Sequence, residues 1–430
     1  MHLDGKEMQT EKKKKLAHAT CLIWLCWLIY ACSYMGKVNY SANINQVMDY
    51  YAVTKGEAGL VGTFFFFAYG AGQIVNGLLC KKYNVKWTIF FSLLVSGTIN
   101  FTIPFVSNFA LIKFLWLANG VSMSFLWPSL IRLLSENLSK KDMARASVII
   151  GTTVATGTFA IYGLSAIYAT FNFKLAFYTA GVALPAVAIV WLIFLPKFMR
   201  GAKAEADLQD KMDEVVISLP KAQTQKSEGT ERKLLFLTIF TLMFYAVATN
   251  LIKDGLTTWV PNILKEGFKL DDSLSIIFTL ALPMVTVFGN MFAVALHKKI
   301  PNFVGQCAFQ FALAGVLILA VIGSLYIGFL PVTIVGFAFA CFFVGACNSI
   351  ITSIFPLFMK GKVNSGLIAG ILNGFCYAGS TISNYGLGAI RDSFGSWYPV
   401  LWFLLIVCGL VCVVCGVYAL IKRYVKKKSV

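Results

Sequence analysis

Residues 234–262 read LLFLTIFTLMFYAVATNLIKDGLTTWVPN, an apolar run in which Lys253 and Asp254 are the only charged residues. About 20 mostly apolar helical residues cross the roughly 30 Å hydrocarbon core of a bilayer. This stretch is therefore predicted to be a transmembrane helix that carries a cation along its length.

Eleven further stretches of similar length and apolarity occur in the 430-residue chain, which is 58% hydrophobic and 13% charged. Such a composition excludes a soluble globular protein. Runs such as Phe64 to Phe67 lack the alternation of a membrane strand, so the predicted class is an all-α membrane protein. The twelve predicted spans are 17–48, 58–80, 86–107, 110–135, 144–171, 174–196, 234–262, 272–297, 303–328, 330–358, 364–389 and 396–421.

The Lys and Arg residues that give the net charge of +18 lie mainly in the predicted loops and tails. With the N-terminus inside the cell, 29 of the 37 Lys and Arg residues fall on the cytoplasmic side. This bias predicts a multi-pass protein of the cell membrane with both termini cytoplasmic. No base-stacking aromatic residues alternate with these cations, so a nucleic-acid partner is not expected. The expected partner is the lipid bilayer. Six cations fall on the outer side: Lys55, Lys113, Lys174, Lys265, Lys269 and Arg391.

The chain repeats itself in two halves. Lys37 lies 44 residues before the dibasic Lys81-Lys82, and Lys253 lies 45 residues before the dibasic Lys298-Lys299. Repeats of this size build many secondary transporters, whose substrate site lies between the halves, and six plus six helices is the major facilitator layout. The predicted parts are a cytoplasmic tail (1–16), an N-terminal half (17–196), a cytoplasmic linker (197–233), a C-terminal half (234–421) and a basic tail (422–430).

Lys37 and Lys253 occupy matching places in the first helix of each half. A lysine in hydrocarbon costs about 3 kcal/mol, so it usually faces a cavity, a partner or an anionic ligand. We predict that the two lysines share one anion site. The alternative is that each lysine reaches the outer membrane surface from the end of a short helix.

Tyr34–Tyr40, YMGKVNY, and Leu251–Leu264, LIKDGLTTWVPNIL, resemble the first and seventh helices of the organophosphate:phosphate antiporter family, which includes the glycerol-3-phosphate and hexose-6-phosphate transporters. The resemblance covers most of the chain. Further matches are Trp127-Pro128 with Arg132, Asn373-Gly374 through Tyr377 and Gly379, and Gly388 with Asp392 and Gly395. It implies a site in which a cation pair, arginines in the family, grips the substrate phosphate.

Three departures from the family pattern affect the expected chemistry. Lys37 and Lys253 replace the arginines, and an ammonium lacks the planar paired contacts of a guanidinium, so selection of phosphate over sulfonate or carboxylate is left open. Thr153 stands where the family has a histidine. Lys81 and Lys82 stand where an Asp-Arg pair is usual, so the gating contacts of that loop are expected to differ.

Asp254 is the only carboxylate in the middle of a predicted span. A gating or coupling role is expected for it, either as a proton carrier or as a partner of Lys253. Polar side chains elsewhere in the spans could complete the substrate site, although each could instead join two helices. They are Tyr34, Asn39, Thr153, Tyr245, Asn250, Asn348, Asn373 and Tyr377.

No phosphate-binding loop, catalytic triad or cysteine-histidine metal spacing occurs, so neither an enzyme nor a cofactor or metal is expected. The predicted function is exchange of a small organic phosphate for inorganic phosphate by a monomer that alternates access. Two alternatives are a membrane sensor of sugar phosphate that does not transport, and a transporter of an organic carboxylate or sulfonate.

Overall fold

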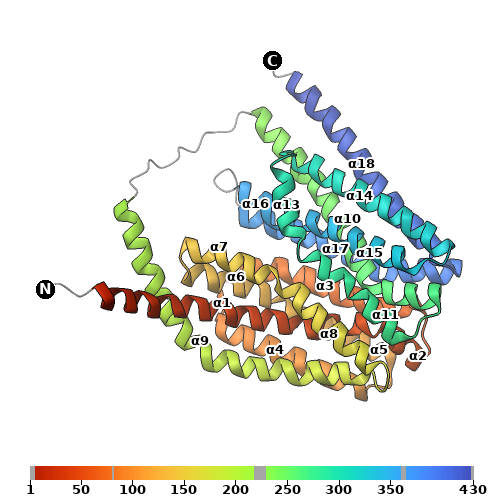
Figure 1. Cartoon of the computed structure of the whole chain (residues 1–430), viewed down its shortest axis with the longest axis horizontal. Coiled ribbons are helices and arrows are strands. Elements are labelled where there is room, and N and C mark those ends of the chain that lie inside the picture. The colour runs from red at the N-terminus through yellow and green to blue at the C-terminus, as the bar shows by residue number, and fades with distance from the viewer. Residues whose placement is uncertain (1–4, 80–81, 217–228, 360–364, 428–430) are drawn as a thin grey trace.

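The computed structural model describes residues 5–79, 82–216, 229–359 and 365–427, and within these the regular structure is helical. The N-terminal half contains α1 (Gly5–Ala42), α2 (Ile44–Tyr51), α3 (Lys55–Leu79), α4 (Val85–Thr102), η2 (Ile103–Phe105), α5 (Phe109–Ser124), α6 (Leu126–Asn137), α7 (Lys140–Gly151), α8 (Thr153–Tyr168) and α9 (Lys174–Val216). The C-terminal half contains α10 (Gly229–Phe268), α11 (Asp272–Thr279), α12 (Ala281–Thr286), α13 (Gly289–His297), α14 (Phe303–Tyr326), α15 (Leu330–Ser349), η3 (Ile350–Ile354), α16 (Phe355–Phe358), α17 (Ser365–Phe394) and α18 (Tyr398–Lys427). Figure 1 shows the halves as two groups of helices, red to yellow and green to blue.

Eleven helical segments of the described residues are long and apolar enough to cross a membrane. The remaining predicted span, 364–389, corresponds to α17, which has 30 residues but mixes polar side chains with apolar ones. Three of these polar side chains, Ser380, Ser383 and Asn384, are almost fully buried. They face protein rather than lipid, which explains why α17 is long enough to span yet less apolar than the others. The predicted all-α fold class is confirmed.

Several predicted spans are divided or extended. The first, 17–48, breaks between α1 and α2 at Asn43, whose amide donates to the Asn39 carbonyl at 2.8 Å and to the Ser165 hydroxyl at 2.9 Å. Such side-chain bonds compete with regular helix bonds. Helix α9 continues to Val216, through residues where a linker was expected.

Helices α3 and α17 pack side by side across the boundary between the halves, without room for a side chain at two glycines. A Cβ atom at Gly59 would overlap the Asn384 carbonyl, and one at Gly62 would overlap the Asn384 side chain. The two halves therefore touch backbone to backbone at Gly59, and the α3 backbone contacts the Asn384 side chain at Gly62.

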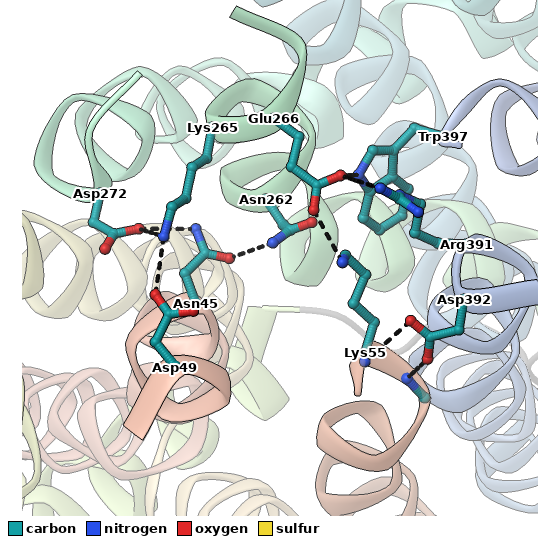
Figure 2. Close-up of polar contacts among 11 residues, drawn as sticks. Asn45, Asp49, Lys55, Asn262, Lys265, Glu266, Asp272, Arg391, Asp392 and Trp397 are labelled. Atoms are coloured by element: carbon teal, nitrogen blue, oxygen red, sulfur yellow. Dashed lines mark hydrogen bonds and ion pairs between the residues drawn. The ribbon is translucent and has the colours of Figure 1, made fainter. Parts of the chain in front are cut away.

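Polar side chains tie the halves together at the end of the molecule where α2, α10, α11 and the start of α3 meet (Figure 2). Lys265 contacts Asp49 at 3.1 Å and Asp272 at 3.0 Å, and Lys55 contacts Glu266 at 3.0 Å. We call this group the interhalf polar cluster. It consists of Asn45, Asp49, Lys55, Asn262, Lys265, Glu266, Asp272, Arg391, Asp392 and Trp397.

The backbone at the start of α3 takes part in the same cluster. The amide of Gly56 donates to a carboxylate oxygen of Asp392 in α17 at 2.6 Å, and the Asn262 amide donates to Asn45 at 2.7 Å. In this conformation the halves are therefore closed against each other at the interhalf polar cluster.

Candidate functional site

Lys37 lies in α1 with only 6% of its surface exposed. Its ammonium donates to the Tyr69 hydroxyl at 3.2 Å and lies 4.8, 4.6 and 4.7 Å from the ring centroids of Tyr30, Tyr34 and Tyr69. Among the described residues, no carboxylate lies within ion-pair distance of Lys37. The lysine is thus held by aromatic rings rather than by an acid.

The helical period and one neighbouring helix produce this cage. Tyr30 and Tyr34 precede Lys37 by seven and three residues, which places all three on one face of α1, while Tyr69 comes from α3. A desolvated cation–π contact contributes about 0.5–2 kcal/mol. Three of them offset much of the roughly 3 kcal/mol cost of a lysine inside a membrane. The cage can therefore hold a cation whose counter-charge is left to a ligand.

Lys253 has a different environment. Its ammonium lies 3.3 Å from a carboxylate oxygen of Asp254, and the other carboxylate oxygen accepts a hydrogen bond from the Ser380 hydroxyl of α17. Asn250 in turn donates to Ser380 at 3.1 Å, and Asn348 of α15 donates to Asn250 at 2.8 Å. A continuous polar chain from three helices therefore ends at the Lys253–Asp254 pair.

Tyrosines connect the two lysines across the boundary. Tyr377 of α17 packs edge to face on Tyr69, with ring centroids 4.8 Å apart. Tyr34 and Tyr377 both lie close enough to Asp254 for an electrostatic interaction. Lys37 of the N-terminal half and Lys253 of the C-terminal half thus adjoin one tyrosine-lined region, which we call the central site.

Three residues expected at the site have other hydrogen-bond partners in this conformation: Asn39 and Tyr245 bond to neighbouring helices, and Thr153 bonds to the preceding turn of its own membrane span. Asn39 donates to Asn100 of α4 at 2.7 Å, and the Thr153 hydroxyl donates to the Ile150 carbonyl at 2.6 Å. The Tyr245 hydroxyl donates to the Val411 carbonyl of α18 at 3.0 Å, within the C-terminal half. Their polar atoms are occupied by these contacts in this conformation.

The other residues predicted to bind substrate or to gate lie outside the tyrosine-lined region or outside the described residues. Asn373 of α17 donates to Gln73 of α3 at 2.6 Å, so it links the halves directly. Lys82 is exposed, and Lys81 lies outside the described residues. The described part of the chain contains no group of three or more His, Cys, Asp or Glu side chains that could hold a metal ion.

Three further residues contact the predicted site residues, although the sequence did not identify them. Tyr30 and Tyr69 complete the cage of Lys37, and Ser380 holds Asp254. The spacing of Tyr30 from Lys37 on one helix face was a usable signal. Tyr69 and Ser380 come from other helices, and no local spacing identifies them.

Comparison with known proteins agrees with this architecture. Residues 26–384 match the model of the Major Facilitator Superfamily. The "probable sulfoacetate transporter SauU" of Cupriavidus necator is 22% identical over 90% of each chain, and the "membrane sensor protein UhpC" of Salmonella typhimurium is 22% identical over 85% of this chain and 84% of that one. The "probable hexose phosphate transport protein" of Chlamydia pneumoniae is 21% identical over 92% of this chain and 90% of that one.

These relatives confirm the resemblance that the first and seventh helices indicated. The family match covers most of the chain, and the helices it requires are present in the structure. The chain belongs to the Major Facilitator Superfamily and is a multi-pass membrane transporter of that type.

Proposed function

We propose that this protein exchanges a small organic phosphate for inorganic phosphate, and that Lys37 and Lys253 bind the anion between the two halves. The observation that carries this proposal is the caged ammonium of Lys37, which is buried and has no carboxylate partner among the described residues. A buried cation without an acid is a site for an anion. A relative named as a hexose phosphate transport protein supports an organic phosphate.

Movement of the anion follows from the placement of the lysines in different halves. An anion that contacts both lysines stabilises a state in which the halves are close at the central site, and this difference in affinity allows the two halves to rock. The charge bias of the loops supports a topology in which the interhalf polar cluster lies outside the cell and both termini lie in the cytoplasm. In that topology the described conformation is closed toward the outside of the cell membrane.

A carboxylate or sulfonate is the second candidate substrate. The specific observation in its favour is that both cations are lysines, which do not make the planar paired contacts by which arginine favours phosphate. The relative named as a sulfoacetate transporter supports this candidate.

A third candidate function is sensing without transport, because one relative is named a membrane sensor protein. Reconstitution of the purified chain in liposomes loaded with phosphate separates these functions. We expect labelled external phosphate to exchange with internal phosphate, and excess glycerol-3-phosphate or hexose 6-phosphate to compete. Competition by sulfoacetate instead would identify the second candidate. Phosphate binding without any exchange would contradict transport and identify a sensor.

A further inference from the structure

Gln73 of α3 is a buried amide with one of its two polar atoms unpaired. The residue is 8% exposed, and its Oε1 atom accepts a hydrogen bond from the Nδ2 atom of Asn373 in α17 at 2.6 Å. Among the described residues its Nε2 atom has no hydrogen-bond partner. A buried polar group without a partner is rare and costly, and a hydrogen bond from a ligand removes that cost.

This amide lies one helical turn from the cage of Lys37. Gln73 follows Tyr69 by four residues on α3, and Asn373 precedes Tyr377 by four residues on α17. Residues four apart on a helix have Cβ atoms about 5–6 Å apart. The Tyr69 and Tyr377 rings are in contact, so the two pairs are neighbouring contacts between the same two helices. Gln73 therefore adjoins the central site.

The accessible surface beside this amide faces the inside of the protein. Asn373 and Tyr377 are partly exposed, and they lie on the side of α17 that points away from Phe375 and Ile382. Phe375 and Ile382 are exposed, as expected for side chains that face lipid. The exposed parts of Asn373 and Tyr377 therefore face the protein interior, where the central site lies.

Close packing on both sides holds the amide pair in place. A Cβ atom at Gly70 would lie 2.6 Å from the Cβ atom of Tyr377, and one at Gly374 would lie 2.6 Å from the side chain of Ile74. The two helices thus leave little freedom for the pair between them. A polar group that is already held in position loses less freedom when a ligand binds to it.

The chemistry of the amide favours a hydroxyl group as its ligand. An amide is neutral, so it offers no counter-charge to a second acidic group. Rotation of both amides about their last bonds preserves a hydrogen bond between Gln73 and Asn373 and presents a carbonyl oxygen in place of the N–H. A hydroxyl both donates and accepts, so it bonds to either arrangement, whereas a carboxylate or sulfonate oxygen only accepts.

We propose that the Gln73 amide binds a hydroxyl group of the organic part of the substrate, while Lys37 and Lys253 bind its phosphate. This inference rests on the proposed function. The ligand class is a short polyhydroxy phosphate monoester, such as glycerol 3-phosphate or a sugar phosphate, with a hydroxyl about 5–6 Å from the phosphate. A substrate with an acidic group at each end, such as sulfoacetate, would place its second charge against a neutral amide.

Two matched esters test the inference. Glycerol 3-phosphate and propyl phosphate share the phosphate and the three-carbon chain, and only the first carries hydroxyl groups. Inorganic phosphate is the third probe. Affinities are measured by titration calorimetry of the purified full chain at about pH 8, where all three probes are mostly dianionic.

For the unmodified chain we expect glycerol 3-phosphate to bind about two- to tenfold more tightly than propyl phosphate, which is the effect of one neutral hydrogen bond. Gln73→Leu removes the amide at similar volume and should lose this preference. The ratio of the two affinities is the readout, because loss of the bond with Asn373 affects both esters alike.

Gln310→Leu is the matched control. Gln310 of α14 is also buried with an Nε2 atom that is unpaired among the described residues. Its Oε1 atom accepts from the Cys347 thiol of α15, so it lies within the C-terminal half. The Gln310→Leu protein should keep the preference for glycerol 3-phosphate.

Equal affinities of the two esters for the unmodified chain, or tighter binding of propyl phosphate, would overturn the inference, and this result holds even where Gln73→Leu does not fold. A preference that persists in Gln73→Leu would also overturn it. Binding of none of the three probes would contradict the proposed function and this inference together. Binding of phosphate and both esters without a preference contradicts the inference alone.

Discussion

The ammonium of Lys265 in α10 lies 3.1 Å from the Asp49 carboxylate in α2, so a direct ion pair joins the C-terminal half to the N-terminal half. The same ammonium contacts Asp272 at 3.0 Å. Lys265 is 30% exposed, and pairs of this kind contribute about 0.2–1 kcal/mol each. The pair therefore stabilises the contact between the halves mainly as one part of the larger interhalf polar cluster.

Replacement of Lys265 by glutamine should loosen this end of the molecule. Loss of the Lys265–Asp49 pair, which crosses between the halves, removes up to about 1 kcal/mol from the closed state, roughly a fivefold shift toward opening. Hydrogen–deuterium exchange of the purified protein checks this, with faster exchange expected in peptides covering residues 44–54 and 262–272. The control is Lys269→Gln, which removes an exposed lysine four residues away. Equal exchange in the two variants would show that the Lys265–Asp49 pair does not hold the halves together.

Substitution at Gly59 tests the contact of α3 with α17. A methyl group there would overlap the Asn384 carbonyl, and overpacking of this kind costs about 1–3 kcal/mol. We expect Gly59→Ala to lower the melting temperature and to slow anion exchange in liposomes. Gly77→Ala in the same helix is the matched control, because a Cβ there meets nothing within 4 Å. A Gly59→Ala protein as stable and active as the Gly77→Ala protein would contradict the described packing.

Substitution of Tyr69 tests the aromatic cage around Lys37. Tyr69→Phe keeps the ring over Lys37 but removes the hydroxyl that accepts from the ammonium at 3.2 Å. A hydrogen bond of this kind contributes about 0.5–1.5 kcal/mol, so phosphate affinity should fall about two- to tenfold. Tyr69→Ala removes the ring as well and should weaken binding further. Calorimetric titration with phosphate measures both, and unchanged affinity in both variants would exclude Tyr69 from the site.

The fold could be predicted from the sequence because membrane helices are recognisable by their length and apolar composition. It predicted α17 as well, although Ser380, Ser383 and Asn384 lower its apolar content, because the surrounding residues stay apolar over a sufficient length. The break at Asn43 was not predicted, since it depends on a contact with Ser165 in another helix. Local patterns cannot report such a contact.

The candidate site was predictable in its charges but not in its surroundings. Lys37, Lys253 and Asp254 stand out because charge is rare in the spans. Asn39 and Tyr245 are as polar as Tyr377, yet their hydrogen bonds go to Asn100 and Val411 of neighbouring helices. Which polar side chain faces the central site depends on helix rotation and packing, and these are fixed by contacts distant in sequence.

Anion exchange by lysine variants tests whether Lys37 and Lys253 bind the transported anion. Lys37→Gln and Lys253→Gln are reconstituted in liposomes beside Lys203→Gln, a control at an exposed lysine of α9. Entry of labelled phosphate is measured against internal phosphate, with equal amounts of folded protein verified by size-exclusion chromatography. We expect loss of exchange in both central variants and normal exchange in the control. Exchange at the unmodified rate in Lys37→Gln and Lys253→Gln would contradict an anion site formed by the two lysines.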